Sequence, residues 1–188
     1  MGYVVRQKSH IDSELGLLMP RLRSFAAALT GSEARTQELV KAARNQILAR
    51  MAKERGHTPL ALWAFAQTQK LWANRMKRNA GARPDPVDPR LFQPRSRVND
   101  GGASARFAMR IAQLGPQQRG TLHLVYGERL SYDEVAEIFD VPVSAIISRL
   151  AKCHAQLAHA EERDAAAPDM TPRRPQTEAE ARRQGWAA

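Results

Sequence analysis

The spacing of apolar residues constrains the fold of this chain more than any other feature. Apolar residues recur at intervals of three and four, as in Leu15, Leu18, Leu22 and Phe25, and no segment alternates apolar and polar residues with a period of two. The first spacing gathers side chains on one face of an α-helix, whereas the second is typical of a strand. The sequence therefore predicts an all-α protein.

Three helices are expected in the first part of the chain. Gly31 follows the first apolar stripe at the position of a C-cap. Thr58 and Pro59 form a cap pair that precedes a third helical stretch. Between them lies a second apolar stripe, formed by Leu39, Ala43, Ile47 and Met51. These patterns predict a small helical domain over residues 13–80.

Residues 81–103 interrupt the helical pattern. They contain four prolines and the pair Gly101-Gly102. This composition is typical of a flexible linker, which for about 25 residues has a root-mean-square span of roughly 25–30 Å. We therefore expect two helical domains that can sit well apart.

The spacing after the linker predicts a helix-turn-helix over residues 104–160. Ser104 can cap one helix, and Pro116 can start the next. Ser131 and Glu134 have the S-x-x-E spacing of a capping box and open a short helix. After a tight turn, one apolar stripe marks a longer final helix and consists of Ile146, Leu150, Cys153 and Leu157. A short capped helix, a turn and a longer helix form the layout of a helix-turn-helix.

Charge indicates the kind of partner. The chain has 29 Lys and Arg against 19 Asp and Glu, a formal charge of +10, which favours an anionic partner such as nucleic acid. Residues 161–188 contain few apolar residues, and we expect them to form a disordered tail. No stretch is apolar enough for a membrane span or a secretory signal. We therefore expect a cytoplasmic protein without a membrane partner.

The final helix carries residues suited to DNA. Ser144, Ser148, Arg149 and Lys152 offer short hydroxyls and long cations that can contact base edges and phosphates. Ile147 is expected to face outward, where it can touch a thymine methyl group or a protein partner. An ordinary solvated helix surface is the alternative interpretation of this face.

Residues Leu114–Leu157 carry a family resemblance. Their sequence, LGPQQRGTLHLVYGERLSYDEVAEIFDVPVSAIISRLAKCHAQL, contains the patterns L-x-P-x-x-R, L-S-Y-x-E-x-A and S-R-L. It resembles the C-terminal, promoter-recognising domain of bacterial extracytoplasmic-function sigma factors. The segments MPRLRSFAAALTGS, ELVKAA and LALWAFAQTQKLWANRMKR resemble a degenerate version of the N-terminal domain of that family.

The resemblance implies binding to core RNA polymerase and to promoter DNA, without covalent catalysis. It places Glu38, Leu39 and Val40 in the polymerase-docking segment. It also implies a promoter-melting helix with a basic end, to which it assigns Trp72, Arg75, Lys77 and Arg78. Trp72 beside Arg75 can stack on a flipped base, although core packing is the alternative for this indole and for Trp63.

The same resemblance implies that the final helix reads promoter DNA, through Ser144, Ile147, Ser148, Arg149 and Lys152. Ile147 stands where the family commonly has Lys, and Arg35, Lys41 and Arg44 make the docking segment unusually basic.

Sites for metals, cofactors or catalysis are not indicated. His154 and His159 are five residues apart, which turns them to different faces of a helix. Cys153 lies in the apolar stripe and is expected to be a small core residue. We therefore predict no catalytic residue, metal, cofactor or small-molecule substrate.

The combined interpretation is a sigma-like transcription initiation factor. Two alternatives stay open. One is a degenerate sigma mimic that binds a regulatory protein such as an anti-sigma factor, and the other is a helix-turn-helix DNA binder that acts without polymerase.

Overall fold

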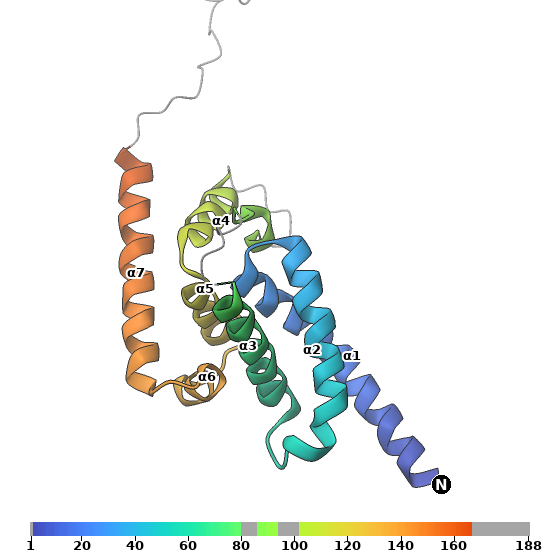
Figure 1. The fold of residues 1–188 in the computed structure, drawn as a ribbon. Helices are drawn as coiled ribbons and strands as arrows, with labels where there is room; N and C mark the ends of the chain where they lie inside the picture. The colour runs from blue at the N-terminus through green and yellow to red at the C-terminus, as the bar shows by residue number, and fades with distance from the viewer. Residues whose placement is uncertain (1, 80–85, 94–101, 167–188) are drawn as a thin grey trace, which may run out of the picture. The chain divides into compact units, whose positions relative to one another are not determined.

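The computed structural model describes residues 2–79, 86–93 and 102–166, and all regular structure in them is helical (Figure 1). This confirms the predicted all-α class. None of the described helices is both long and apolar enough to cross a membrane. In chain order the elements are α1 Gly2–Thr30, α2 Glu33–Glu54, α3 Leu60–Arg78, the 3₁₀-helix η1 Pro89–Phe92, α4 Ala103–Gln113, α5 Pro116–Leu122, the π-helix η2 His123–Gly127, α6 Tyr132–Phe139 and α7 Val143–Ala166.

Helices α1 to α3 contain the three predicted helical stretches, but α1 begins at Gly2, before the predicted start of the domain at residue 13. Gly31 ends α1 with a positive φ of 66°, and its N–H donates to the Ala27 carbonyl at 2.8 Å. Because L side chains rarely adopt this backbone conformation, glycine suits the position. Helix α3 begins at Leu60 and has Pro59 at its N-cap, one residue later than the cap pair predicts.

Both predicted domains contribute to one hydrophobic core. Phe25 of α1 makes edge contacts with Phe65 of α3 and with Phe139 of α6, at ring centroid distances of 5.3 and 6.4 Å. Gly120 of α5 lies so close to α1 that a Cβ atom there would be 2.8 Å from Leu29 Cδ2. The described residues up to Leu157 therefore form one compact unit.

This packing differs from the expectation that the linker lets the halves sit apart. Leu124 and Ile138 of the second half are fully buried in the same core as α1 and α3, and separating the halves would expose this apolar surface to water. The boundaries of the two domains stay a prediction.

Part of the predicted linker is also folded onto α1. The N–H of Asp88 donates to the Gly31 carbonyl at 2.9 Å, and the Asp88 side chain caps η1 by accepting from the Arg90 N–H at 2.9 Å. The Phe92 ring lies 5.5 Å from the guanidinium of Arg119. Residues 81–85 and 94–101 of the predicted linker lie outside the described part.

Arg119 joins the two halves through backbone carbonyls. It is only 3% exposed, and its Nε donates to the Ala28 carbonyl of α1 at 2.8 Å. Its Nη1 donates to the carbonyls of Leu114 and Ala112 at the end of α4. Burial lowers the pKa of this guanidinium. The arginine of the L-x-P-x-x-R pattern thus caps the C-terminal ends of two helices.

The helix-turn-helix comprises α6, a turn and α7. Ser131 Oγ accepts from the Glu134 N–H at 3.3 Å, and Glu134 Oε2 accepts from the Ser131 N–H at 2.8 Å, which confirms the predicted capping box. Asp140, with a φ of 54°, ends α6 in the left-handed conformation. The turn thus places the start of α7 directly after α6.

Two predicted boundaries are wrong. Helix α4 begins at Ala103 after Gly102, so Ser104 lies in the first turn rather than at the cap. Helix α7 continues to Ala166, so the predicted tail does not begin at residue 161, and residues 167–188 lie outside the described part. The described residues 158–166 belong to a second unit, in which His159 Nδ1 lies 3.4 Å from Glu162 Oε2.

Candidate nucleic-acid interface

One side of α7 forms an exposed face, which we call the α7 outer face and define as Ser144, Ile147, Ser148 and Lys152. All four residues are exposed, and Ile147 retains 51% of its surface. Their spacing of three, four and eight residues places them together on one side of the helix. The predicted outward position of Ile147 is confirmed. The opposite side of α7 is buried and carries Ile146, Leu150 and Cys153.

Arg149 does not belong to the α7 outer face, which corrects the sequence interpretation of that surface. Its Nη1 donates to Thr121 Oγ1 at 3.0 Å and its Nη2 donates to Gln117 Oε1 at 3.2 Å, both on α5. Its guanidinium lies 4.8 Å from the centroid of the Phe139 ring. Position 149 follows the buried Ile146 by three residues, which turns its side chain toward the core. A DNA contact by Arg149 stays a prediction.

Two further polar contacts fix the position of α7. The Tyr126 hydroxyl and His154 Nε2 lie 2.9 Å apart, and Gln118 Nε2 donates to Gln156 Oε1 at 2.7 Å. Burial raises the pKa of the Cys153 thiol. Because the thiol is neutral and buried, it packs as the expected small core residue.

The predicted polymerase-docking residues occupy three different environments. Glu38 is exposed, Val40 is partly buried, and Leu39 is only 1% exposed in the core. Leu39 therefore stabilises the core. In this packing, a binding partner can reach Glu38 and the exposed part of Val40 but not Leu39.

The predicted melting helix presents its cations but buries its indoles. Trp63 and Trp72 are each only 7% exposed. Lys77 and Arg78 are exposed at the end of α3, whereas Arg75 Nη1 lies 3.7 Å from Glu38 Oε2 of α2. Arg75, a predicted DNA-binding residue, therefore lies next to Glu38 of the predicted polymerase-docking segment.

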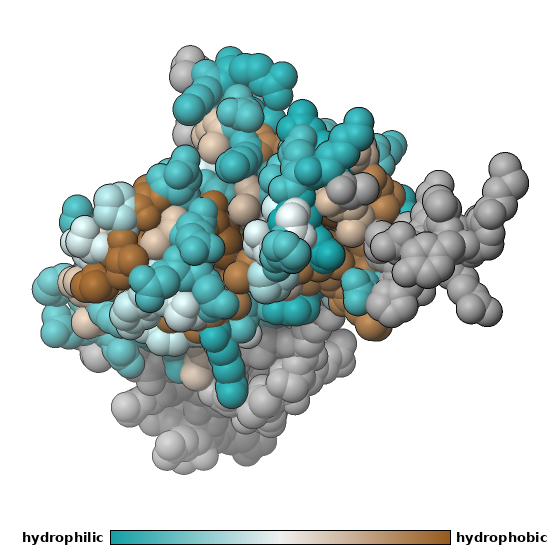
Figure 2. Space-filling model, turned by 90° about the horizontal axis from the view of Figure 1, so that it is seen from below, coloured by the Kyte–Doolittle hydropathy of each residue, from teal (hydrophilic) through white to brown (hydrophobic). Residues whose placement is uncertain are grey.

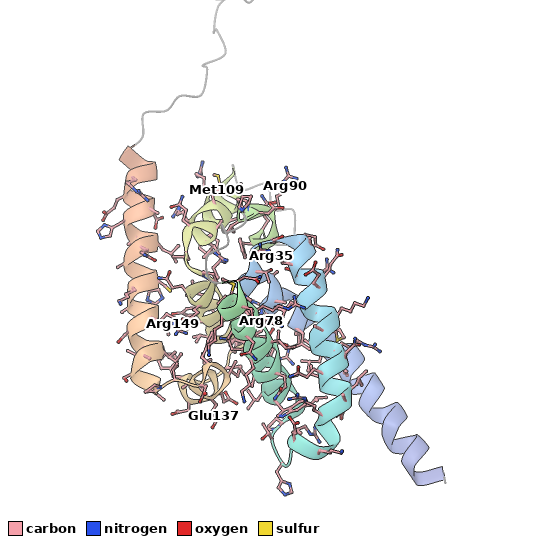
Figure 3. All side chains as sticks on the ribbon, viewed as in Figure 1. Arg35, Arg78, Arg90, Met109, Glu137 and Arg149 are labelled. Carbon is pink, nitrogen blue, oxygen red and sulfur yellow. The ribbon has the colours of Figure 1, made fainter. Side chains whose placement is uncertain are left out.

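A cavity of about 610 Å³ opens beside these residues. It is lined by Trp72, Arg75 and Arg78 of α3 and also by Arg35 and Arg119. Figure 3 labels Arg35 and Arg78, which lie near the start of α2 and the end of α3. Sequence reasoning missed Arg35 and Arg119 as site residues, because only the folded chain brings α2, α3 and α5 together.

A second, more apolar groove has a volume of about 750 Å³. Its lining includes Phe107 of α4 and Tyr126 of η2, both of which are about half exposed, together with Leu157 of α7. On the face seen in Figure 2, patches of hydrophobic surface lie among hydrophilic residues. Exposed aromatic side chains beside a groove are typical of protein-binding surfaces.

Residues 110–159 match the family model "Sigma-70, region 4". The match covers the end of α4, the whole helix-turn-helix and most of α7. No curated protein matches the chain.

Solved structures share the fold. A chain in the co-crystal structure of the sigma factor RpoE with the anti-sigma factor NepR from Bartonella quintana aligns with a TM-score of 0.64, at 19% identity over 81% of this chain and 97% of that chain. A chain in the NMR structure of the PhyRSL–NepR complex from Sphingomonas sp. Fr1 aligns with a TM-score of 0.59 and 22% identity. The alignment covers 88% of this chain and 95% of that chain.

The complex of the anti-anti-sigma factor PhyR with NepR from Bartonella quintana aligns with a TM-score of 0.52, at 15% identity over 79% of this chain and 49% of that chain. The family match confirms the resemblance of residues 114–157 to a sigma factor domain, and the solved structures share the fold of most of the chain.

Proposed function

We propose that this sigma-like chain, which carries a sigma-70 region 4 domain, binds core RNA polymerase and directs it to promoter DNA. The observation that carries the proposal is the α7 outer face, which is exposed within the segment that matches region 4. A helix of this kind fits the major groove of DNA, which is about 12 Å wide. Ser144, Ser148 and Lys152 then reach base edges and phosphates, and Ile147 meets a thymine methyl group.

The N-terminal half completes the proposed function. Arg75, Lys77 and Arg78 supply the positive charge that a single DNA strand attracts. Glu38 and Val40 supply an accessible edge for polymerase. Trp72 can stack on a base only when its surroundings in the present packing change, because the indole is almost fully buried.

Co-purification with core RNA polymerase tests the proposal directly. Tagged full-length protein is expected to retain the polymerase subunits from a lysate of its host. A folded protein that retains no polymerase would contradict the proposal and favour a helix-turn-helix protein that acts alone.

DNA binding is tested by the salt dependence of promoter affinity. Lys152→Ala removes one phosphate contact and should reduce the slope of log affinity against log salt by about 1. Arg44→Ala is the matched control, because Arg44 is an exposed cation on α2 rather than on α7. Equal slopes for the two variants would show that Lys152 does not contact a DNA phosphate.

A second candidate function is binding of an anti-sigma protein. Two observations favour it: the exposed Ile147, and the apolar groove beside Phe107 and Tyr126. The structures named above are complexes with the anti-sigma factor NepR. This function is compatible with the first, since a sigma factor can be held inactive by such a protein.

The variant Ile147→Lys separates the two functions. Because Ile147 is half exposed, the substitution should leave the melting temperature nearly unchanged. A new cation on the α7 outer face should maintain or raise DNA affinity, whereas loss of an apolar anchor should weaken an anti-sigma partner at least tenfold. Unchanged partner binding would place the anti-sigma contact elsewhere.

A further inference from the structure

A charged contact joins the two halves at the edge of their shared core. Arg21 of α1 and Glu128, which directly follows η2, are 107 residues apart in the chain, and Arg21 Nε donates to Glu128 Oε2 at 2.6 Å. The Arg21 guanidinium also lies 5.7 Å from the centroid of the Phe65 ring of α3. The pair thus ties α1 and α3 of the first half to the end of η2 in the second half. We call Arg21 and Glu128 the clamp.

The clamp is only partly shielded from solvent. The side chain of Arg21 is 45% exposed, whereas that of Glu128 is 9% exposed. A charge pair with one exposed member is screened by salt and contributes modestly to stability, so it can separate at a modest cost in free energy. Three other ion pairs stay within the first half, namely Arg23–Glu33, Arg50–Glu54 and Arg75–Glu38. The clamp differs from these three because it crosses between the halves.

The packing that the clamp supports covers one side of α3. Phe65, Gln69 and Trp72 share this side, because they are four and three residues apart, and none of them is more than 7% exposed. Helix α6 of the helix-turn-helix packs against α3, and the Phe25 ring contacts both Phe65 of α3 and Phe139 of α6. In this packing, a DNA strand cannot reach the covered side of α3.

Two buried polar atoms in the described part of the chain lack a hydrogen-bond partner in this packing. They are Gln69 Oε1 on the covered side of α3 and His123 Nε2, which lies 3.4 Å from Glu128 Oε1 beside the clamp. A buried polar atom without a partner costs free energy, and contact with water removes that cost. These atoms therefore favour an opening that exposes them, and the packed state depends on contacts such as the clamp.

We propose that the clamp is an autoinhibitory contact that holds the halves together and keeps DNA away from the covered side of α3. When Arg21 and Glu128 separate, the halves can move apart and α3 becomes accessible. This inference rests on the proposed function, which assigns DNA opening to α3, and it adds the contact that controls access to that helix. A ligand that binds only the open state has an apparent affinity in proportion to the open fraction. Weakening the clamp should therefore strengthen DNA binding.

Three variants of the full chain test the clamp. Arg21→Glu places two carboxylates opposite each other and should open the halves. Arg21→Glu combined with Glu128→Arg restores an ion pair with exchanged charges, at the net charge of the unmodified chain, and should close them again. Arg23→Glu is the matched control, because it makes the same charge change on α1 and breaks the ion pair with Glu33, which lies within the first half.

Fluorescence anisotropy at fixed ionic strength measures binding of a fluorescein-labelled single-stranded DNA oligonucleotide. Arg21→Glu and Arg23→Glu have the same net charge, so they should lose the same nonspecific attraction for DNA. We expect the Arg21→Glu protein to bind at least about threefold more tightly than the Arg23→Glu protein, because its open fraction is larger. The charge-exchanged protein should bind like the unmodified chain.

Distances between two spin labels report opening independently of DNA. Nitroxides on Arg44→Cys of α2 and Ser148→Cys of α7 occupy exposed positions in the two halves, while the native Cys153 is buried. In double electron–electron resonance, Arg21→Glu should add a population with longer distances, and the charge exchange should remove it. A melting curve shows that each protein is folded. If Arg21→Glu does not fold, Glu128→Gln replaces it, with Glu33→Gln as the control.

Two results would overturn the proposal. One is a distance distribution that the folded clamp variant leaves unchanged, which would show that the clamp does not hold the halves together. The other is an opened protein that binds DNA no more tightly than its control, which would show that opening exposes no DNA-binding surface. Retention of polymerase by the unmodified chain is measured separately, so that a failure of the proposed function is distinguishable from a failure of the clamp.

Discussion

Arg119 shows how a single residue connects distant parts of this chain. Its guanidinium is buried and is satisfied by carbonyls at the C-terminal ends of α1 and α4, where the helices leave acceptors unpaired. A cation at the negative end of a helix dipole is favourable, and here one cation serves two helices. The side chain therefore stabilises the contact between the halves as well as the start of α5.

Arg119→Met should reduce the free energy of unfolding by about 1–3 kcal/mol for each buried carbonyl that it leaves without a donor. The methionine fills part of the volume but leaves the carbonyls of Ala28 and Leu114 without a donor. Urea denaturation measures the loss, with Arg44→Ala as a surface control. A decrease below about 1 kcal/mol would mean that water replaces the guanidinium easily.

Glu128 forms a second polar contact between the halves. Arg21 Nε of α1 donates to Glu128 Oε2 at 2.6 Å, and His123 Nε2 lies 3.4 Å from Glu128 Oε1. The His123 Nε2 atom has no well-aligned hydrogen bond, so the Arg21 contact is the better defined of the two. His123 and Arg21 hold the pKa of the Glu128 carboxyl below its ordinary value, against the opposing effect of burial.

Glu128 should therefore make stability depend on pH. When folding lowers the pKa of a carboxyl group, its ionised form stabilises the folded protein at pH values above the pKa of the unfolded state. This contribution disappears as the pH falls through the lower pKa of the folded state. Glu128→Gln should lower the unfolding free energy at pH 7 by about 1–3 kcal/mol. The difference from the unmodified chain should shrink below the ordinary carboxyl pKa of 4.5. A difference that is constant from pH 7 to pH 3 would show that the charge of Glu128 has no role.

Arg149 and Lys152 should respond differently to substitution, although both lie on α7. Arg149→Ala removes two hydrogen bonds to α5 and a contact with Phe139, so it should cost about 1–3 kcal/mol of stability. Lys152→Ala should leave stability within about 0.5 kcal/mol and weaken DNA binding. Thermal unfolding and DNA titration of both variants check this separation. A stable Arg149→Ala protein with relaxed sequence preference would instead make Arg149 a base reader.

At the scale of elements, the sequence predicts those structural features that depend only on residues close together in the chain. The apolar stripes, Gly31 and the Ser131–Glu134 pair predict helices and their ends because periodicity and capping act within a few residues. The same signals did not reveal η1 or the inward turn of Arg149, since both depend on contacts with segments far away in the sequence. The cavity arginines belong to this second class.

The capping box of α6 should contribute measurably to the helix-turn-helix. Ser131→Ala removes the acceptor for the Glu134 N–H and should cost about 0.5–2 kcal/mol. Ser148→Ala is the matched control, because Ser148 is exposed in the interior of α7, where alanine is a favourable helix former. Chemical denaturation compares the two variants. Equal stability would show that water caps α6 as well as Ser131 does.

At the scale of the whole molecule, the contact between the halves could not be read from the sequence. The proline-rich composition of residues 81–103 is typical of a flexible connection, and each half has apolar stripes of its own. Whether two such halves share a core depends on shape complementarity. Gly120 illustrates this, because its lack of a side chain lets α5 approach Leu29 and Phe139 closely.

Gly120→Ala tests whether the halves unfold together. The added methyl group would lie 2.8 Å from Leu29 Cδ2 and 3.2 Å from Phe139 Cζ, and such overpacking typically costs about 1–3 kcal/mol. Gly16→Ala is the matched control: no atom would lie within 4 Å of its Cβ, and Gly16 is exposed within α1. This control should gain roughly 0.5–1 kcal/mol, because alanine favours a helix.

Amide hydrogen exchange distinguishes a shared core from two independent domains. In a shared core, Gly120→Ala lowers the protection of α3 and of α6 by the same factor, although α3 belongs to the other half of the chain, because both helices pack against Phe25. In two independent domains, protection falls in α6 while α3 stays unchanged, and that result would contradict the common core.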